Sequence, residues 1–117
     1  MNAEIYKEQI KDNVVSVMLD YMSEDEDCGY TKKDVQKCEI VLVEYIDNLS
    51  QLDQPTDKSI MQQVKKVVVS LNKLNAKTDY CLIETDAREN IWQIIQNSAA
   101  ECGLKTEEDI TEEWREW

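Results

Sequence analysis

Apolar residues recur three or four positions apart through most of the chain, which is the spacing of an amphipathic helix. The densest run lies at 35–49, within a predicted helix 31–49, where one stripe contains Val35, Cys38, Leu42, Tyr45, Ile46 and Leu49. Ile40, Val41 and Val43 lie off that stripe, so the segment is apolar around much of its circumference. Their β-branching leaves a strand as the alternative, but strands seldom reach this length. We therefore expect a central helix that is buried on more than one side.

The same spacing predicts four further helices, at 3–22, 57–75, 85–102 and 106–117. The stripe of the first of these contains Ile5, Ile10, Val14, Val17, Met18 and Tyr21. Thr31 with Asp34, and Thr106 with Asp109, have the spacing of a capping box at a helix start. Gly103 follows the predicted helix 85–102 where a left-handed cap residue belongs. The chain has only two Gly and one Pro, and helices joined by short loops need few turn residues. The sequence thus predicts an all-α fold, a compact bundle of about five helices.

The length and charge of the chain limit the kinds of partner that it can bind. At 117 residues we expect a single helical domain over 1–117. The 25 acidic and 13 basic side chains give a formal net charge of −12, which repels phosphate backbones and anionic lipid. We therefore expect no nucleic acid and no membrane as partner, and favour a basic protein.

No run approaches the roughly 18 apolar residues of a membrane span, and the first residues lack the pattern of a secretory signal. A cytoplasmic location with reduced thiols is expected.

Acidic residues are concentrated in two segments. Residues 20–27 contain five acids and no base, and residues 101–117 contain seven acids and two bases. Trp114 and Trp117 share one side of the predicted last helix, where an aromatic anchor would border the acidic surface. The candidate protein-binding residues are Glu24, Asp25, Glu26, Asp27, Glu108, Glu112, Glu113, Trp114 and Trp117. The alternative is a solvated acidic face with both tryptophans packed into the bundle.

The acidic loop 23–29 invites a calcium interpretation, which its spacing excludes. With Gly29 at the sixth position of an EF-hand loop, Glu24 would be first, Cys28 fifth and Val35 twelfth. The oxygen ligands required at the fifth and twelfth positions are therefore missing.

Residues 58–77 hold five lysines and no acid. One interpretation is a patch for a phosphate or an acidic partner. The favoured interpretation is a solvated face that neutralises nearby acidic helices, since no arginine or stacking aromatic residue interleaves the lysines.

Residue types needed for common catalytic sites are absent. The chain has no His, which excludes Ser-His and Cys-His nucleophile pairs, and it has no Gly-rich phosphate loop. Its four cysteines are widely spaced and form no zinc motif. Carboxylates four apart, such as Glu108 with Glu112, fit a solvated face better than an active site. We expect no enzyme, no cofactor, no metal and four free thiols, with thiol chemistry at Cys28 or Cys81 as the remaining catalytic alternative.

Several short motifs are spread along the chain. They are Met18-Leu19-x-x-Met22, Val35-x-Lys37, Ile40-x-Leu42-Val43, Leu71-Asn72-x-Leu74, Ile83-Glu84-Thr85, Ala87-Arg88-Glu89 with Ile91, and Arg115-Glu116-Trp117. Through these motifs, about residues 18–117 resemble a family of small, acidic, all-helical bacterial proteins of unknown function. The chain departs from the family at Tyr80, Cys81 and Leu82, where the relatives are acidic. The resemblance implies a compact all-helical domain and lends no catalytic residue.

Two classes of function remain. We expect a small acidic, non-catalytic protein-binding module, such as an immunity protein or antitoxin that neutralises a basic toxin or nuclease domain. The alternative is a structural or regulatory helical module that self-associates or joins a larger assembly; the protein would be a monomer or a homodimer. Acidic segments that meet on one surface would favour the inhibitor, and exposed Trp114 and Trp117 would favour assembly.

Overall fold

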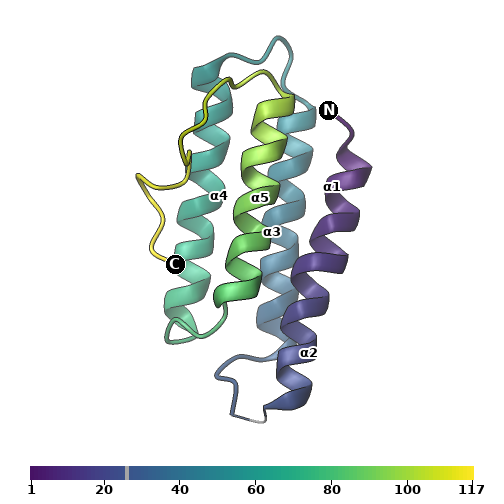
Figure 1. Cartoon of the computed structure of the whole chain (residues 1–117), viewed down its shortest axis with the longest axis vertical. Coiled ribbons are helices and arrows are strands. Elements are labelled where there is room, and N and C mark those ends of the chain that lie inside the picture. The colour runs from purple at the N-terminus through teal and green to yellow at the C-terminus, as the bar shows by residue number, and fades with distance from the viewer. Residues whose placement is uncertain (26) are drawn as a thin grey trace.

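The structure is a computed structural model, and it describes residues 1–25 and 27–117. The elements in chain order are α1 (Ala3–Gln9), a π-helical segment (Ile10–Val15), α2 (Ser16–Glu24), α3 (Lys32–Ser50), α4 (Asp57–Lys77) and α5 (Thr85–Glu101). The first three follow one another without a break as one long helix, so the described residues form a bundle of four helices (Figure 1). The predicted all-α bundle is confirmed, and the first four predicted helices end within two residues of the observed ends.

Helix α3 is the central helix, as predicted. The long first helix packs against one side of it and α4 against another. The predicted stripe is buried, with Leu42 and Ile46 fully inaccessible. The expectation of burial around much of the circumference is wrong at Ile40, which is 63% exposed on a side of α3 that the described helices leave uncovered.

The π-helical segment decides which face of the first helix is buried. The buried residues there are four apart: Tyr6, Ile10, Val14 and Met18. In an α-helix, four residues advance about 40° beyond a full turn, so such a row would drift off the face. The wider turns of the π-helix offset that drift. Ile5, which the sequence pattern places in the apolar stripe, is therefore 49% exposed, and Tyr6 is buried in its place.

Side-chain caps begin two of the helices. At the start of α3, the Asp34 carboxylate accepts the Thr31 N–H at 2.9 Å and the Asp34 N–H donates to the Thr31 hydroxyl, which confirms the capping box. Thr56 and Ser59 form the corresponding pair at the start of α4. These contacts satisfy N–H groups that a helix start leaves without partners.

The predicted fifth helix, at 106–117, is wrong. Gly103 has φ +112° and ends α5 in a Schellman motif, with the Leu104 N–H donating to the Ala99 carbonyl at 3.1 Å. Residues 104–117, which we call the strap, then continue as a series of turns across α4 (Figure 1). Thr106 and Asp109 accept hydrogen bonds within these turns, and the predicted capping box does not form.

All the helices contribute to a single buried cluster. The loop between α4 and α5 adds Leu82 and Ile83. The buried Tyr45 hydroxyl lies 2.9 Å from the Ser98 hydroxyl, so its polar atom is satisfied, and burial raises the pKa of Tyr45. Among the described residues, no helix combines the length and apolar character needed to cross a membrane.

Replacing Leu42 by Ala tests the central position of α3. The side chain is 0% exposed, so its loss removes buried surface and leaves a cavity, which we expect to cost about 2–5 kcal/mol in the free energy of unfolding. Ile40→Ala, on the same helix, is the matched control and should change stability by less than about 0.5 kcal/mol. Urea titrations of both variants measure the difference. Equal effects would contradict the placement of α3 at the centre.

Candidate protein-binding site

The two acidic segments lie at different places on the molecule. Residues 20–25 and 27 lie at the end of α2 and in the following loop, at the lower end in Figure 1, whereas the strap crosses α4 higher up. Glu24 and Asp27 are exposed and Asp25 is half-buried. Glu26, also a predicted binding residue, lies outside the described residues. The depressions lined by Glu24 and by the acids of the strap share no residue, so the two segments do not form one surface.

The predicted binding residues of the strap are three glutamates and two tryptophans, which differ in exposure. Glu108, Glu112 and Glu113 are exposed around a shallow depression. Trp114 and Trp117 are half-buried and pack against the core cluster. The tryptophans therefore hold the strap to the bundle, and little of either is free to anchor a partner.

A different group of acids surrounds a groove between the end of α2 and the start of α5. Its apolar lining comes from Val17, Met18, Tyr30, Leu82 and Ala87, and its polar lining from Asp20, Tyr21, Glu24, Glu84, Thr85 and Asp86. We call this site, with a volume of about 380 Å³, the α2–α5 groove. Of the predicted binding residues that the structure describes, only Glu24 lines it.

Local structure places the four carboxylates around this groove. Asp20 and Glu24 are four apart on α2 and so share one face of it. Glu84 is the residue that precedes α5, and Asp86 lies in its first turn, where the helix dipole favours negative charge. The Glu84 side chain makes no capping hydrogen bond.

The four carboxylates lack cationic partners within the described part of the chain. Glu84 and Arg88 lie four apart but form no ion pair there; they share only the backbone hydrogen bond from the Arg88 N–H to the Glu84 carbonyl, at 2.7 Å. None of the four ion pairs recorded for the described residues involves an acid of the groove. Among the residues that the structure describes, no lysine or arginine lines the groove.

Two tyrosines form one side of the groove. The rings of Tyr21 and Tyr30 stack with centroids 6.3 Å apart. The buried Tyr30 hydroxyl donates to the Met18 carbonyl at 2.9 Å, while Tyr21 is 40% exposed. The negative charge of Glu84, and to a lesser extent that of Asp25, raises the pKa of Tyr21. The Tyr21 ring therefore lies in a negative electrostatic potential. An exposed aromatic face, an apolar floor and several carboxylates together suit a cationic side chain with an aliphatic stem.

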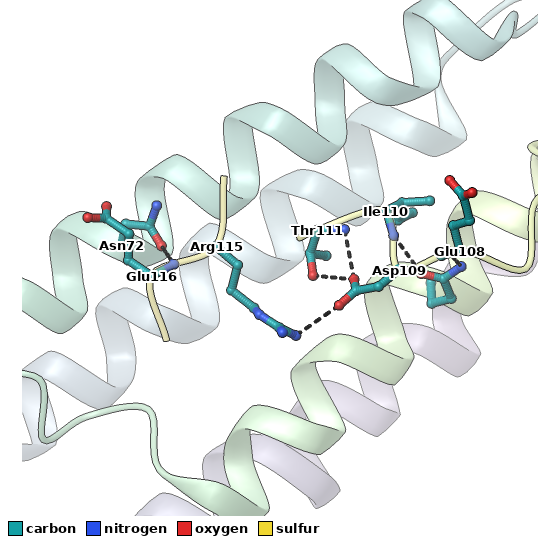
Figure 2. A network of polar contacts seen from close by, with 8 residues as sticks. Asn72, Glu108, Asp109, Ile110, Thr111, Arg115 and Glu116 are labelled. Atoms are coloured by element: carbon teal, nitrogen blue, oxygen red, sulfur yellow. Dashed lines mark hydrogen bonds and ion pairs between the residues drawn. The ribbon is translucent and has the colours of Figure 1, made fainter. Parts of the chain in front are cut away.

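Two side-chain amides hold the backbone of the strap. Asn72 of α4 donates to the Trp114 carbonyl at 2.7 Å and accepts the Glu116 N–H at 3.0 Å. Gln96 of α5 donates to the Glu108 carbonyl at 2.9 Å and accepts the Ile110 N–H at 3.2 Å. Each amide, which we call a clamp, thus binds one C=O and one N–H that are two residues apart. Figure 2 shows the contacts along the strap.

The Asp109 carboxylate contacts two other residues of the strap. Its carboxylate accepts from the Thr111 hydroxyl at 2.6 Å and from the Thr111 N–H at 2.9 Å, and lies 3.2 Å from the Arg115 guanidinium (Figure 2). Burial alone would raise the pKa of Asp109. The hydrogen bonds from Thr111 and the charge of Arg115 lower this pKa by more than burial raises it, so the pKa lies below its usual value. Arg115 in turn lies 5.5 Å from the centroid of the Trp117 ring.

All four cysteines are unpaired thiols. Cys38 is buried, and that burial raises the pKa of its thiol to about 12. Cys81 packs closely on Gly29, where an added Cβ would lie 2.8 Å from the Cys81 Sγ. Across the described residues, no three His, Cys, Asp or Glu side chains are arranged to hold a metal ion.

Comparison with known proteins identifies no relative of this chain. No family model, curated protein or solved structure matches the chain significantly. The resemblance noted in the sequence therefore stays a prediction, and the function has to be inferred from the surfaces of the molecule.

Asp109→Asn should destabilise the protein in a pH-dependent way. Because the folded pKa of Asp109 is lowered, the stabilisation is present above the unfolded pKa of about 3.9 and is lost as the pH falls through the folded value. Loss of hydrogen bonds to a charged group should cost about 1–3 kcal/mol at neutral pH. Urea titrations from about pH 7 to about pH 3 should show the difference from wild type shrinking. Asp53→Asn, at an exposed acid, is the control; an Asp109 effect that is constant with pH would contradict the account.

Thiol counting under denaturing, non-reducing conditions should return four free thiols per chain. The reason is that each cysteine is unpaired in the structure, with Cys38 sealed in the core. In the native state, a thiol reagent should leave Cys38 unmodified, because burial disfavours the reactive thiolate. A count of two after denaturation would reveal a disulfide and contradict this prediction.

Proposed function

We propose that the protein is a small, non-catalytic protein-binding module that holds a basic segment of another protein in the α2–α5 groove. The observation that carries the proposal is the combination of four carboxylates, an apolar floor and no lining base. Four like charges in one place repel one another and cost stability. A bound cationic side chain would relieve that repulsion.

The lining of the groove defines the chemistry of its ligand. The aliphatic stem of a lysine or arginine would pack on Met18 and Ala87, and its charged group would lie among Asp20, Glu24 and Glu84. The exposed face of Tyr21 offers a cation–π contact. Arginine fits best, because its planar guanidinium both stacks on aromatic rings and binds carboxylates through two hydrogen bonds.

The class of partner follows from the charge of the whole molecule. A net charge of −12 would speed encounter with a cationic domain, most strongly at low salt. An immunity protein or antitoxin that neutralises a basic toxin or nuclease domain has this profile. The acidic strap lies away from the groove, so it would contribute to the long-range attraction more than to contacts at the bound site.

Neutralising the groove should weaken binding. The groove variant carries Glu24→Gln, Glu84→Gln and Asp86→Asn. The control variant carries Glu8→Gln, Asp53→Asn and Glu107→Gln, exposed acids that do not line the groove, and so has the same net charge. Affinity capture from a lysate of the source cells, followed by titration of the captured basic protein, should show at least about a tenfold loss of affinity for the groove variant. The control variant should stay within about threefold of wild type.

Two outcomes would contradict the proposal. Equal losses in both variants would mean that overall charge, not the groove, determines binding. A wild type that captures no basic protein would remove the proposed partner class. For the inhibitor role, the captured protein should arrest growth when expressed alone, and co-expression of wild type, but not of the groove variant, should restore growth.

A further inference from the structure

Two of the four cysteines lie on neighbouring loops. Cys28 belongs to the loop between α2 and α3, and Cys81 belongs to the loop between α4 and α5. A Cβ added to Gly29 would lie 2.8 Å from the Cys81 Sγ and 2.9 Å from the Cys81 Cβ, so the Cys81 side chain lies directly on the Gly29 backbone. Cys28 is the residue before Gly29, and adjacent Cα atoms are about 3.8 Å apart. Folding therefore makes neighbours of two thiols that are far apart in the sequence.

The turn that leads into Cys81 is strained. Asp79 and Tyr80 have φ of 57° and 63°, in the left-handed region that residues with a Cβ rarely adopt. Such strain costs free energy and persists only where surrounding contacts hold it. Here the Tyr80 N–H donates to the Asn75 carbonyl at 2.7 Å, while the Tyr80 side chain is 59% exposed, so its own packing does not explain the strain. The turn instead fixes the position of the next residue, Cys81.

The two thiols differ in exposure, as a stepwise reaction requires. Cys81 is partly exposed and can meet a small molecule in solution. Cys28 is only 9% exposed, and its Sγ donates to the Tyr30 carbonyl at 3.1 Å. Redox-sensing sites commonly combine an accessible cysteine with a second cysteine beside it that resolves the first adduct. Cys81 suits the first role and Cys28 the second.

We propose that Cys28 and Cys81 form a redox-active pair, which a low-molecular-weight disulfide converts reversibly to an intramolecular disulfide. In the presence of a reductant both residues remain thiols, as they are in the structure. The bond forms only when an oxidised small molecule is supplied. In a reducing compartment, such disulfides are usually transient and serve redox sensing or catalysis.

The exchange proceeds in two steps, each an attack of a thiolate on a disulfide sulfur. The Cys81 thiolate first attacks one sulfur of the small disulfide, and a bond forms between that sulfur and the Cys81 Sγ. The S–S bond of the small molecule breaks, and its other half leaves as a thiolate that takes up the proton lost by Cys81. The Cys28 thiolate then attacks the Cys81 Sγ, and the second half leaves with the proton lost by Cys28. Two protein thiols thus lose two electrons, and one small disulfide gains them to become two thiols.

The pair lies beside the α2–α5 groove. Tyr30 and Leu82, which closely follow Cys28 and Cys81 in the chain, both line that groove. The disulfide would join the two loops that carry these lining residues. The proposal does not depend on what the groove binds, because the exchange involves only the two thiols and the small molecule.

Disulfide mapping of the full-length protein tests the proposal. The reduced protein is equilibrated with oxidised and reduced glutathione at about pH 8, where an ordinary thiol is partly ionised. After the free thiols are blocked, trypsin cleaves at lysine and arginine and leaves each cysteine in a different peptide, so mass spectrometry identifies every linked pair. The Cys28–Cys81 linkage should exceed every other pair by at least about tenfold. Concentrated urea should abolish this preference, because unfolding separates the two loops.

Serine variants separate the two steps. Cys28→Ser should accumulate one glutathione on Cys81 and stop there, because the resolving thiol is missing. Cys102→Ser removes the other partly exposed cysteine and is the matched control, in which the Cys28–Cys81 disulfide should form as in the wild type. If Cys28→Ser fails to fold, Cys81→Ser replaces it and should show no glutathione on the buried Cys28.

Several results would overturn the proposal. One is a native protein whose thiols all stay free in the oxidising buffer, or whose Cys81 carries glutathione with no link to Cys28. Another is a Cys28–Cys81 linkage that is equally frequent in urea. A third is a Cys28→Ser variant with no more glutathione on Cys81 than the wild type has. The experiment contains no basic partner, so its failure would leave the proposed binding of a basic segment unaffected.

Discussion

Burial of α3 is the constraint on which the rest of the structure depends. Leu42 and Ile46 are inaccessible, and the first helix and α4 pack on different sides of α3. The first helix keeps one row of residues in contact with the bundle only because the π-helical segment offsets the drift of a four-residue repeat. The end of α2 and the start of α5 then lie side by side, which places the α2–α5 groove.

The acids of the α2–α5 groove and the acids of the strap differ in whether a base lies near them. In the α2–α5 groove, four carboxylates are held together without a cation from the described chain, an arrangement that costs stability and that a ligand would relieve. Beside the strap, Lys73 of α4 lines the same depression as Glu113 and Glu116, so a base of the molecule itself lies near these acids. In a protein with a net charge of −12, the α2–α5 groove is thus the site that suits a basic partner.

Sequence periodicity predicted the four helices because each buries a stripe long enough to repeat several times. It failed at the strap, where Ile110, Trp114 and Trp117 have helical spacing but extend over barely two turns. A helix that short is marginal alone, and the clamps from Asn72 and Gln96 satisfy the backbone in a non-helical conformation. Periodicity also failed at Ile5, because it assumes a constant number of residues per turn, which the π-helical segment breaks.

The candidate site was only partly predictable for a different reason. The clustering of acids along the chain identified Glu24 as a candidate residue. Glu84 and Asp86 lie about sixty residues further along the sequence, so only folding brings them to the same groove.

Chemical-shift mapping by NMR is the most direct test of the central claim, which is that this groove binds cationic side chains. Addition of a short peptide of alternating arginine and leucine should shift amide resonances of residues 17–24 and 82–87, with little change along the strap. Shifts that spread evenly over all acidic surfaces, or that concentrate on the strap, would contradict the account.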